Sequence, residues 1–171
     1  MKLQSHLFEK LKNPINLCLV LGTLLAIAAC TGGSTPPRDL LLHPSDFPGQ
    51  SLTQSLETID DSLLDGPAVL VKLNGPVFNI LESLVLFESE VLALNVLAEI
   101  KQDQLTQGVF SNPEKGFDDH SGIMYETLNG EDGSTLFFVE GRALVRIAVT
   151  GENHPDKIWE IARIARKKSA N

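Results

Sequence analysis

Four neighbouring side chains that can do chemistry lie between residues 118 and 121. Asp118 and Asp119 supply carboxylates, His120 supplies an imidazole, and Ser121 supplies a hydroxyl. Carboxylates and imidazoles bind divalent metals, but adjacent residues rarely aim at one ion, and this spacing matches none of the regular zinc or calcium signatures. The pattern therefore favours a polar loop with local hydrogen bonds, and leaves Asp118, Asp119 and His120 as weak candidates for metal ligands.

Hydrolytic chemistry has little support in the sequence. His120 beside Ser121 is not a catalytic triad, and the G-x-S-x-G turn that exposes a nucleophilic serine is absent. A glycine-rich phosphate loop is also absent, which argues against a nucleotide site. We therefore predict no catalytic residue, no dissociable cofactor and no enzymatic activity. A metal-dependent hydrolase acting through His120 is the distant alternative.

The cysteines indicate a different chemistry. Residues 1–16 carry three lysines and one acid, and an uncharged stretch from Leu17 to Ala29 leads to Cys30. This is the layout of a secretory signal peptide. Thirteen residues rise about 20 Å as a helix, which is short of the roughly 30 Å of a bilayer's hydrocarbon core, so the stretch does not predict a permanent transmembrane anchor.

The four residues Ile27-Ala28-Ala29-Cys30 resemble the lipobox of bacterial lipoproteins. The resemblance implies that residues 1–29 are a lipoprotein signal peptide and that Cys30 becomes the new N-terminus, carrying a diacylglycerol and an N-acyl chain such as palmitate. It also implies an extracytoplasmic location, at the outer membrane or at the outer face of the cytoplasmic membrane. An ordinary signal peptide, or an uncleaved anchor with Cys30 incidental, is the alternative.

Charge and cysteine usage limit the partners of the exported part. The formal net charge is −8, and removal of residues 1–29, with three lysines and one glutamate, makes it −10. A negative surface repels phosphate backbones and anionic headgroups, so we exclude nucleic acid and expect the body to stand off the lipid surface. Because Cys18 lies in the removed segment, no disulfide is expected, and the core must hold the domain together.

The sequence predicts two parts in the mature chain. Residues 30–38 form the lipidated Cys30 and a flexible tether, and residues 39–171 form a single domain. Within that domain, Leu52, Leu56, Ile59 and Leu63 have helical spacing and predict a helix over residues 51–66. Residues 67–75 predict a strand that ends in Asn74-Gly75, the dipeptide that tolerates positive φ in a hairpin turn.

The segment from residue 76 to residue 106 allows two interpretations. One is a single helix entered at Pro76. The other, which we favour, is a strand up to Phe87 followed by a helix capped at residues 88–90.

The last third of the chain predicts three strands and a helix. Residues 122–128, 134–139 and 142–151 form a meander, with Ala143, Val145, Ile147 and Val149 on one face of the last strand. Residues 152–168 form a helix whose buried stripe is Ile158, Ile161, Ala162 and Ala165.

The resulting order is αββαβββα, an α+β fold with an antiparallel sheet of about five strands packed against helices. The closing hairpin and helix, "FFVEGRALVRIAVTG" followed by "IWEIARIARKK", resemble those of small bacterial lipoprotein domains with a Mog1/PsbP-like fold. The resemblance implies a non-enzymatic accessory or ligand-sensing module, and it transfers no functional residues.

Three residues are candidates for binding. Arg142 and Arg146 lie on the second face of the last strand and form a small anion-recognising patch, unless they pair with neighbouring acids. The neighbours considered are Lys72 and Glu82 for the patch, and Glu126 and Glu140 for the pairing. Trp159 is the only tryptophan, and it either anchors a partner or packs partly into the core.

Two functions fit these features best. The first is a lipid-anchored, extracytoplasmic binding protein, an accessory or assembly subunit of an envelope or membrane-protein complex. The second is a lipoprotein carrier or sensor that encloses a small apolar or anionic ligand between sheet and helices.

Overall fold

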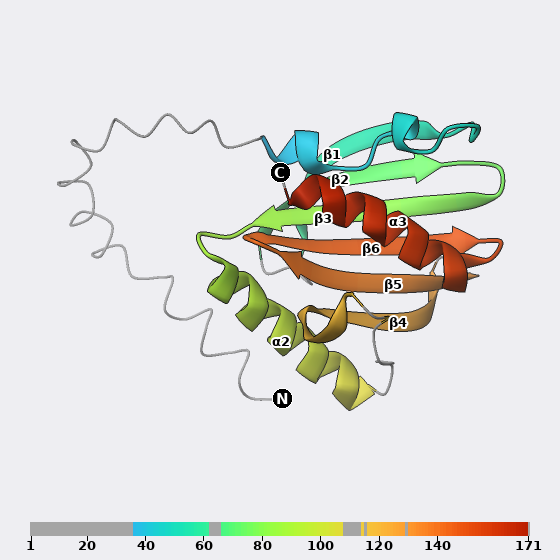
Figure 1. The fold of residues 1–171 in the computed structure, drawn as a ribbon. Coiled ribbons are helices and arrows are strands. Elements are labelled where there is room, and N and C mark those ends of the chain that lie inside the picture. The colour runs from blue at the N-terminus through green and yellow to red at the C-terminus, as the bar shows by residue number, and fades with distance from the viewer. Residues whose placement is uncertain (1–35, 62–65, 108–113, 115, 129, 171) are drawn as a thin grey trace. The chain divides into compact units, whose positions relative to one another are not determined.

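Six strands hydrogen-bond into one antiparallel sheet, and two α-helices pack on it (Figure 1). The computed structural model describes residues 36–61, 66–107, 114, 116–128 and 130–170. The strand order across the sheet is β1-β2-β3-β6-β5-β4. The strands are β1 (Thr53–Asp61), β2 (Gly66–Asn74), β3 (Phe78–Leu86), β4 (Ser121–Leu128), β5 (Glu131–Glu140) and β6 (Ala143–Gly151).

The helices connect and follow these strands. The α-helices are α2 (Glu90–Gln107), between β3 and β4, and α3 (His154–Ser169), at the end of the chain. Short 3-10 helices are η2 (Pro37–Leu40), η3 (Pro44–Asp46) and η4 (Asp118–His120). None of the helices in the described part of the chain is long and apolar enough to cross a membrane. The α+β class and the antiparallel sheet are confirmed.

The predicted first helix is wrong. Most of residues 51–66 form β1 and the start of β2, with Thr53 opposite Asn74 and Asp61 opposite Gly66. The order is therefore βββαβββα, and the sheet has six strands rather than about five. β1 lies at the edge of the sheet, where residues 53–58 are exposed, so no buried face imposes alternation on its sequence. Its apolar residues matched a helical spacing without forming a helix.

The segment after β2 forms a strand and then a helix, which is the interpretation that the sequence favours. β3 ends at Leu86, and the Ser89 Oγ accepts a hydrogen bond of 3.3 Å from the Leu92 backbone N–H at the start of α2. Neither Asn74 nor Gly75 takes the positive φ that this dipeptide tolerates. A Cβ at position 75 would lie 2.6 Å from the Leu52 Cδ2 atom and 3.1 Å from the Phe78 carbonyl oxygen, so a larger residue would have to displace the Leu52 side chain.

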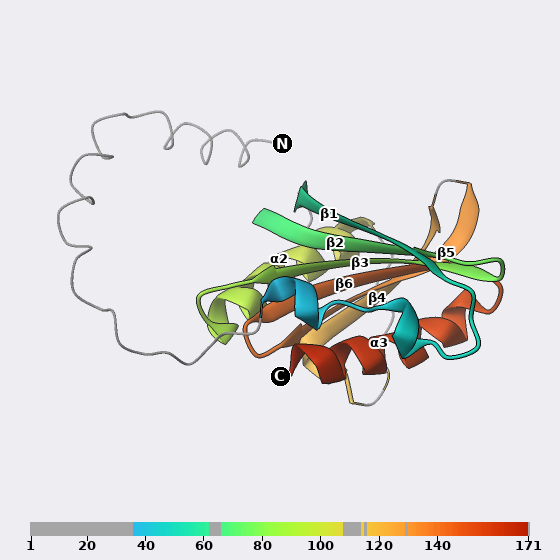
Figure 2. The same ribbon diagram turned by 90° about the horizontal axis from the view of Figure 1, so that it is seen from above.

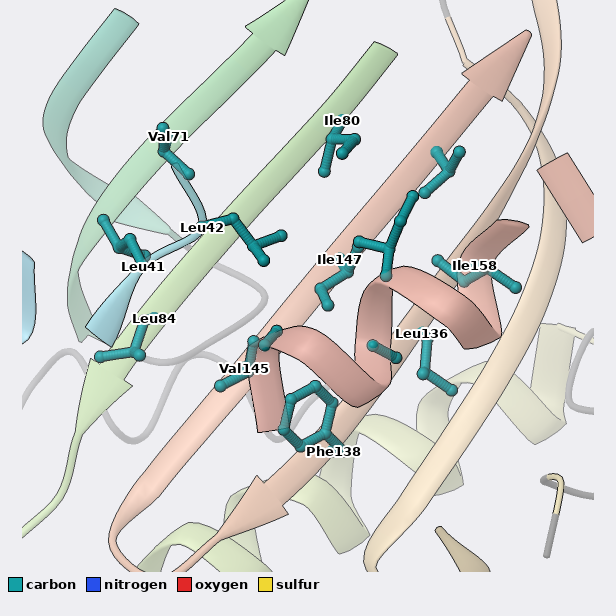
Figure 3. Packing of buried hydrophobic residues seen from close by; sticks show 14 of the residues in the cluster. Leu41, Leu42, Val71, Ile80, Leu84, Leu136, Phe138, Val145, Ile147 and Ile158 are labelled. Atoms are coloured by element: carbon teal, nitrogen blue, oxygen red, sulfur yellow. The ribbon is translucent and has the colours of Figure 1, made fainter. Parts of the chain in front are cut away.

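One sheet face, called the α3 face, is covered over its central strands, while Leu56 and Tyr125 on the two edge strands stay exposed. The predicted stripe of α3 is confirmed, since Ile158, Ile161, Ala162 and Ala165 are its buried residues. Beside α3, a strap formed by residues 36–50 buries Leu40, Leu41, Leu42 and Phe47 against the same face (Figures 2 and 3). The predicted inward residues of β6 are buried in this cluster: Ala143, Val145, Ile147 and Val149.

The other face, called the α2 face, is only partly covered. α2 places Ala93, Leu97 and Ile100 against Phe137, Leu144 and neighbouring residues. These contacts lie at the end of the sheet where β3 finishes and β6 begins. The opposite end of the α2 face, where β2 ends and β3 begins, carries residues that stay partly or fully exposed. That uncovered end is called the open half.

Candidate binding site

The open half contains a hollow whose centre is apolar and whose border is polar. Its cavity volume is about 380 Å³. Its lining includes Lys72 and Asn74 of β2, Asn79 and Leu81 of β3, Ala148 and Thr150 of β6, and Leu128 and Glu131 beside the β4–β5 turn. This set is called the sheet hollow.

The sheet register brings these residues together from distant parts of the sequence. Asn79 lies opposite Asn74 on one side and Thr150 on the other, which gives one polar row. In the next row, Leu81 lies between Lys72 and Ala148. Because directly opposed residues of antiparallel strands point to the same face, both rows face the sheet hollow.

Hydrogen bonds hold the polar border in place. The Asn79 side-chain amide donates to the Thr150 Oγ1 over 3.5 Å and accepts from the Gly75 N–H over 3.3 Å. The Lys72 ammonium lies 3.1 Å from a Glu57 carboxylate oxygen, and both side chains are close to half exposed. The hollow therefore offers an oriented amide and hydroxyl, one ammonium and an aliphatic floor, which are groups suited to binding.

The row next to the sheet hollow holds Arg146 at the centre of the sheet. Arg146 lies opposite Ser83 of β3 and Phe137 of β5, on the α2 face, and it is partly exposed. The Ser83 side chain is fully buried, and its hydroxyl has no hydrogen-bond partner among the described residues. Arg146 thus lies where the covered half of the face meets the open half.

The α3 face holds a buried carboxyl instead of an open site. Glu82 is fully buried, and its Oε2 accepts a hydrogen bond of 2.6 Å from the Leu42 N–H of the strap. Burial raises the pKa of Glu82 to about 8, against smaller lowering effects of that hydrogen bond and of Lys168. At neutral pH the carboxyl is therefore protonated. Leu42, itself fully buried, closes it off from solvent.

The cations near the end of α3 are engaged by acids. Arg163 lies 2.6 Å from Glu114, and Lys168 lies 2.8 Å from Asp46. Arg166 lies 2.6 Å from Glu140 and also donates to the Gly116 carbonyl. The hollows beside this helix end are lined mainly by these ion-paired side chains, whereas the sheet hollow adds an apolar floor and an oriented amide and hydroxyl to its one ion pair.

Comparison with known proteins supports the fold. No family model matches the chain, and no curated protein matches it. One solved structure similar to this chain is the extracellular domain of PknH from Mycobacterium tuberculosis, with a TM-score of 0.60 and 12% sequence identity. The match covers 75% of this chain and 92% of that one. At this identity the similarity establishes a shared fold. The resemblance to Mog1/PsbP-like domains stays a prediction.

The structure separates the two predicted arginines. Arg146 faces the same side of the sheet as Lys72, as an anion patch requires, whereas Glu82 faces the other side. Arg142 lies in the β5–β6 turn, where its carbonyl accepts a hydrogen bond from the Phe87 N–H. Four residues of strand span about 13 Å, so Arg142 and Arg146 do not form one compact patch.

Glu126 and Glu140, the acids predicted to pair with these arginines, contact other side chains. Glu140 pairs with Arg166. Glu126 accepts a hydrogen bond of 2.5 Å from the Thr135 hydroxyl.

Trp159 lies against the core rather than standing clear of it. Its ring centroid is 5.7 Å from that of Phe117, and it packs partly buried against the α3-face cluster. Its role as a partner anchor stays a prediction.

Asp118, Asp119 and His120 form η4, and no cluster of three potential metal ligands occurs in the described ranges. The Asp118 carbonyl accepts from the Ser121 hydroxyl over 3.0 Å. Local hydrogen bonding of this kind was the favoured interpretation of the segment. Ile27 to Cys30 lie outside the described residues, so lipidation of Cys30 also stays a prediction.

Proposed function

We propose that this chain is an extracytoplasmic, lipid-anchored domain that acts by binding, as an accessory or assembly subunit of an envelope or membrane-protein complex. The partner docks on the open half of the sheet. The observation that carries the proposal is the sheet hollow, a concave surface on the face that α2 covers only in part. Anchoring rests on the lipobox at Ile27-Ala28-Ala29-Cys30. The extracytoplasmic location is supported by the shared fold with an extracellular domain.

The groups in the sheet hollow favour binding over catalysis. Asn79 and Thr150 hydrogen-bond to each other, and Lys72 is matched by Glu57, so the charges and dipoles are oriented for recognition. Catalysis by nucleophilic attack needs a nucleophile beside a base, and the residues described around the hollow supply no such pair. A non-enzymatic role is therefore proposed.

A carrier or sensor of a small ligand is the second candidate. The cavity of about 380 Å³ lies in the lower part of the range occupied by small-molecule sites, roughly 300 to 1,000 Å³. Leu81 and Ala148 supply an apolar floor, and Lys72 with Arg146 supplies positive charge on the same face. These groups suit a small amphipathic molecule that carries an anionic group.

One pair of variants tests both candidates. Thr150→Arg puts a long side chain into the sheet hollow, while Thr58→Arg adds the same side chain to the exposed edge strand β1. The lipidated protein is isolated from detergent-solubilised membranes, and the co-purifying proteins are identified. We expect a stoichiometric partner with the wild type and with Thr58→Arg, and its loss with Thr150→Arg.

Native mass spectrometry of the same samples distinguishes the two candidates. A retained small mass that disappears in Thr150→Arg supports the carrier. A partner protein that disappears in Thr150→Arg supports the accessory subunit. A bare monomer, or equal recovery from both variants, contradicts a site in the sheet hollow. Intact-mass analysis of protein made in its own bacterium tests the anchor, and an unmodified Cys30 contradicts it.

A further inference from the structure

The tether joins the domain at one end of the sheet. The first described residue, Pro36, precedes η2, and η2 lies beside the C-terminal end of α3 in both views (Figures 1 and 2). The connection from β3 to α2 and the β5–β6 turn lie at the same end, where the Phe87 N–H donates to the Arg142 carbonyl over 2.9 Å. This end of the domain is called the tether edge.

The tether edge carries two apolar side chains in the first turn of α2. Val91 is 66% exposed and Leu92 is 43% exposed. The next residue, Ala93, is fully buried against the sheet, so α2 is apolar on its outer side as well as its inner side here. A surface helix of a soluble domain ordinarily shows charged residues on its outer side, so this turn calls for an apolar neighbour.

The length of the tether specifies which neighbour is in reach. Six residue steps separate Cys30 from Pro36, and a fully extended chain spans at most about 3.6 Å per residue, or roughly 20 Å in total. A lipid on Cys30 therefore holds the tether edge within about 20 Å of the headgroups. The far end of the sheet, with Val77 in the β2–β3 loop, is one strand length further away, about 30 Å for nine residues.

The charges at the tether edge permit such contact although the mature chain is acidic. The elements of this edge carry the exposed basic residues Arg38, Arg142 and Lys167 and the exposed acids Asp39, Glu88 and Glu90. Because the two signs are matched in number, this edge lacks the strong negative charge of the chain as a whole. Contact with lipid is then governed by the apolar side chains and depends little on headgroup charge.

We propose that the tether edge rests on the bilayer, with Val91 and Leu92 inserted at the level of the headgroups. The proposal rests on the lipid anchor of the proposed function. It differs from the expectation that the acidic body stands off the membrane. It also gives the domain a fixed orientation, in which the far end of the sheet, close to the sheet hollow, points away from the lipid.

The mature chain offers a direct test because its one cysteine is Cys30. Val91→Cys and the matched control Val77→Cys are each labelled with an environment-sensitive fluorophore in the lipidated protein, reconstituted in phosphatidylcholine vesicles. Val77 is also an exposed valine, at 44%, but it belongs to the β2–β3 loop, which lies at the opposite end of the sheet (Figure 1). We expect the label at position 91 to shift to the blue and to be quenched by nitroxide-bearing lipids, and the label at position 77 to do neither.

The other outcomes overturn the proposal. Equal responses at both positions mean that the domain has no fixed orientation. A blue shift at position 91 that also occurs without vesicles and grows with protein concentration means that a second copy covers this turn. Unlipidated protein, residues 30–171 with Cys30→Ser, is held on nickel-chelating lipids through an N-terminal histidine tag and repeats the test without the natural modification. A failure of the proposed anchor is thereby distinguished from a failure of the membrane contact.

Discussion

The two faces of this sheet are built from the same strands but end in different states. Val149 and Thr150 are neighbours on β6, yet Val149 is fully buried in the core under α3 and the strap, whereas Thr150 is partly exposed in the sheet hollow. On the α3 face even a carboxyl, Glu82, is enclosed and neutral. On the other face the ammonium of Lys72 stays in contact with water. Coverage by helices, and not the strands themselves, therefore decides which face is available for binding.

The difference arises from what each helix can bury. α3 presents a continuous stripe of four buried residues, and the strap adds four more apolar residues beside it. α2 covers only the end of the opposite face, where Ala93 and Leu97 pack near β5 and β6. No strap extends its coverage within the described residues.

The largest difference is expected between two leucines of β3. Leu84 is 1% exposed on the α3 face, while Leu81 is partly exposed in the sheet hollow. Leu84→Ala leaves a cavity in a packed core and should cost about 2–5 kcal/mol of unfolding free energy. Leu81→Ala should cost about 1 kcal/mol or less, because the side chain is already in contact with water. Urea unfolding measures both, and equal losses would mean that the open half is covered.

The next largest effect is expected from the buried Glu82 carboxyl, which makes the free energy of unfolding depend on pH. The folded protein keeps the Glu82 proton after the unfolded chain has lost it, because the pKa is raised from 4.5 to about 8. The free energy of unfolding of the wild type should therefore fall as the pH rises from 4.5 to about 8, by roughly 1 kcal/mol per pH unit, and then level off.

Glu82→Gln isolates this contribution, because glutamine stays neutral. The variant should match the wild type in stability near pH 4 and exceed it progressively up to pH 8. The measurement is urea unfolding of both proteins across this pH range. A constant difference at every pH would show that Glu82 titrates normally and that the strap does not exclude water from it.

A smaller effect is expected at the boundary between the two halves of the α2 face. The Ser83 hydroxyl is buried without a hydrogen-bond partner in the described structure, and such a group destabilises the folded state. Ser83→Ala should therefore raise the unfolding free energy by about 1 kcal/mol. Thermal unfolding of the wild type and the variant tests this. A loss of stability would show that a water or another group satisfies the hydroxyl, and that water reaches further under α2.

The sequence patterns were most accurate for helices and strands that have one buried face and one exposed face. The stripe Ile158, Ile161, Ala162 and Ala165 follows helical spacing because one helix packs on one sheet face. The inward residues of β6 alternate for the same reason. The edge strand β1 has no such face, since Leu56 is 39% exposed and its neighbours are exposed as well. Its pairing with the next strand, β2, joins Asp61 to Gly66 and Thr53 to Asn74, and the spacing of apolar residues within β1 does not report this pairing.

The candidate site was predictable only in part. Arg146 was identified on the second face of β6 by alternation, and that placement is correct. The grouping of Lys72, Asn79 and Thr150 was missed, because it depends on the register of β2, β3 and β6. Their signal was a polar residue at the end of each apolar strand. Glu82 also had a signal, because it is the one acid among the otherwise apolar inward positions of β3.

The smallest effect is expected for the ion pair between Lys72 and Glu57. The two side chains are 43% and 47% exposed, and exposed pairs contribute little because water and salt screen them. Glu57→Gln should therefore change the unfolding free energy by less than about 0.5 kcal/mol, and the change should shrink further at high salt. Urea unfolding at low and high salt provides the measurement. A cost near that of Leu84→Ala, insensitive to salt, would mean that the pair is shielded from solvent, so that the two faces of the sheet are equally closed.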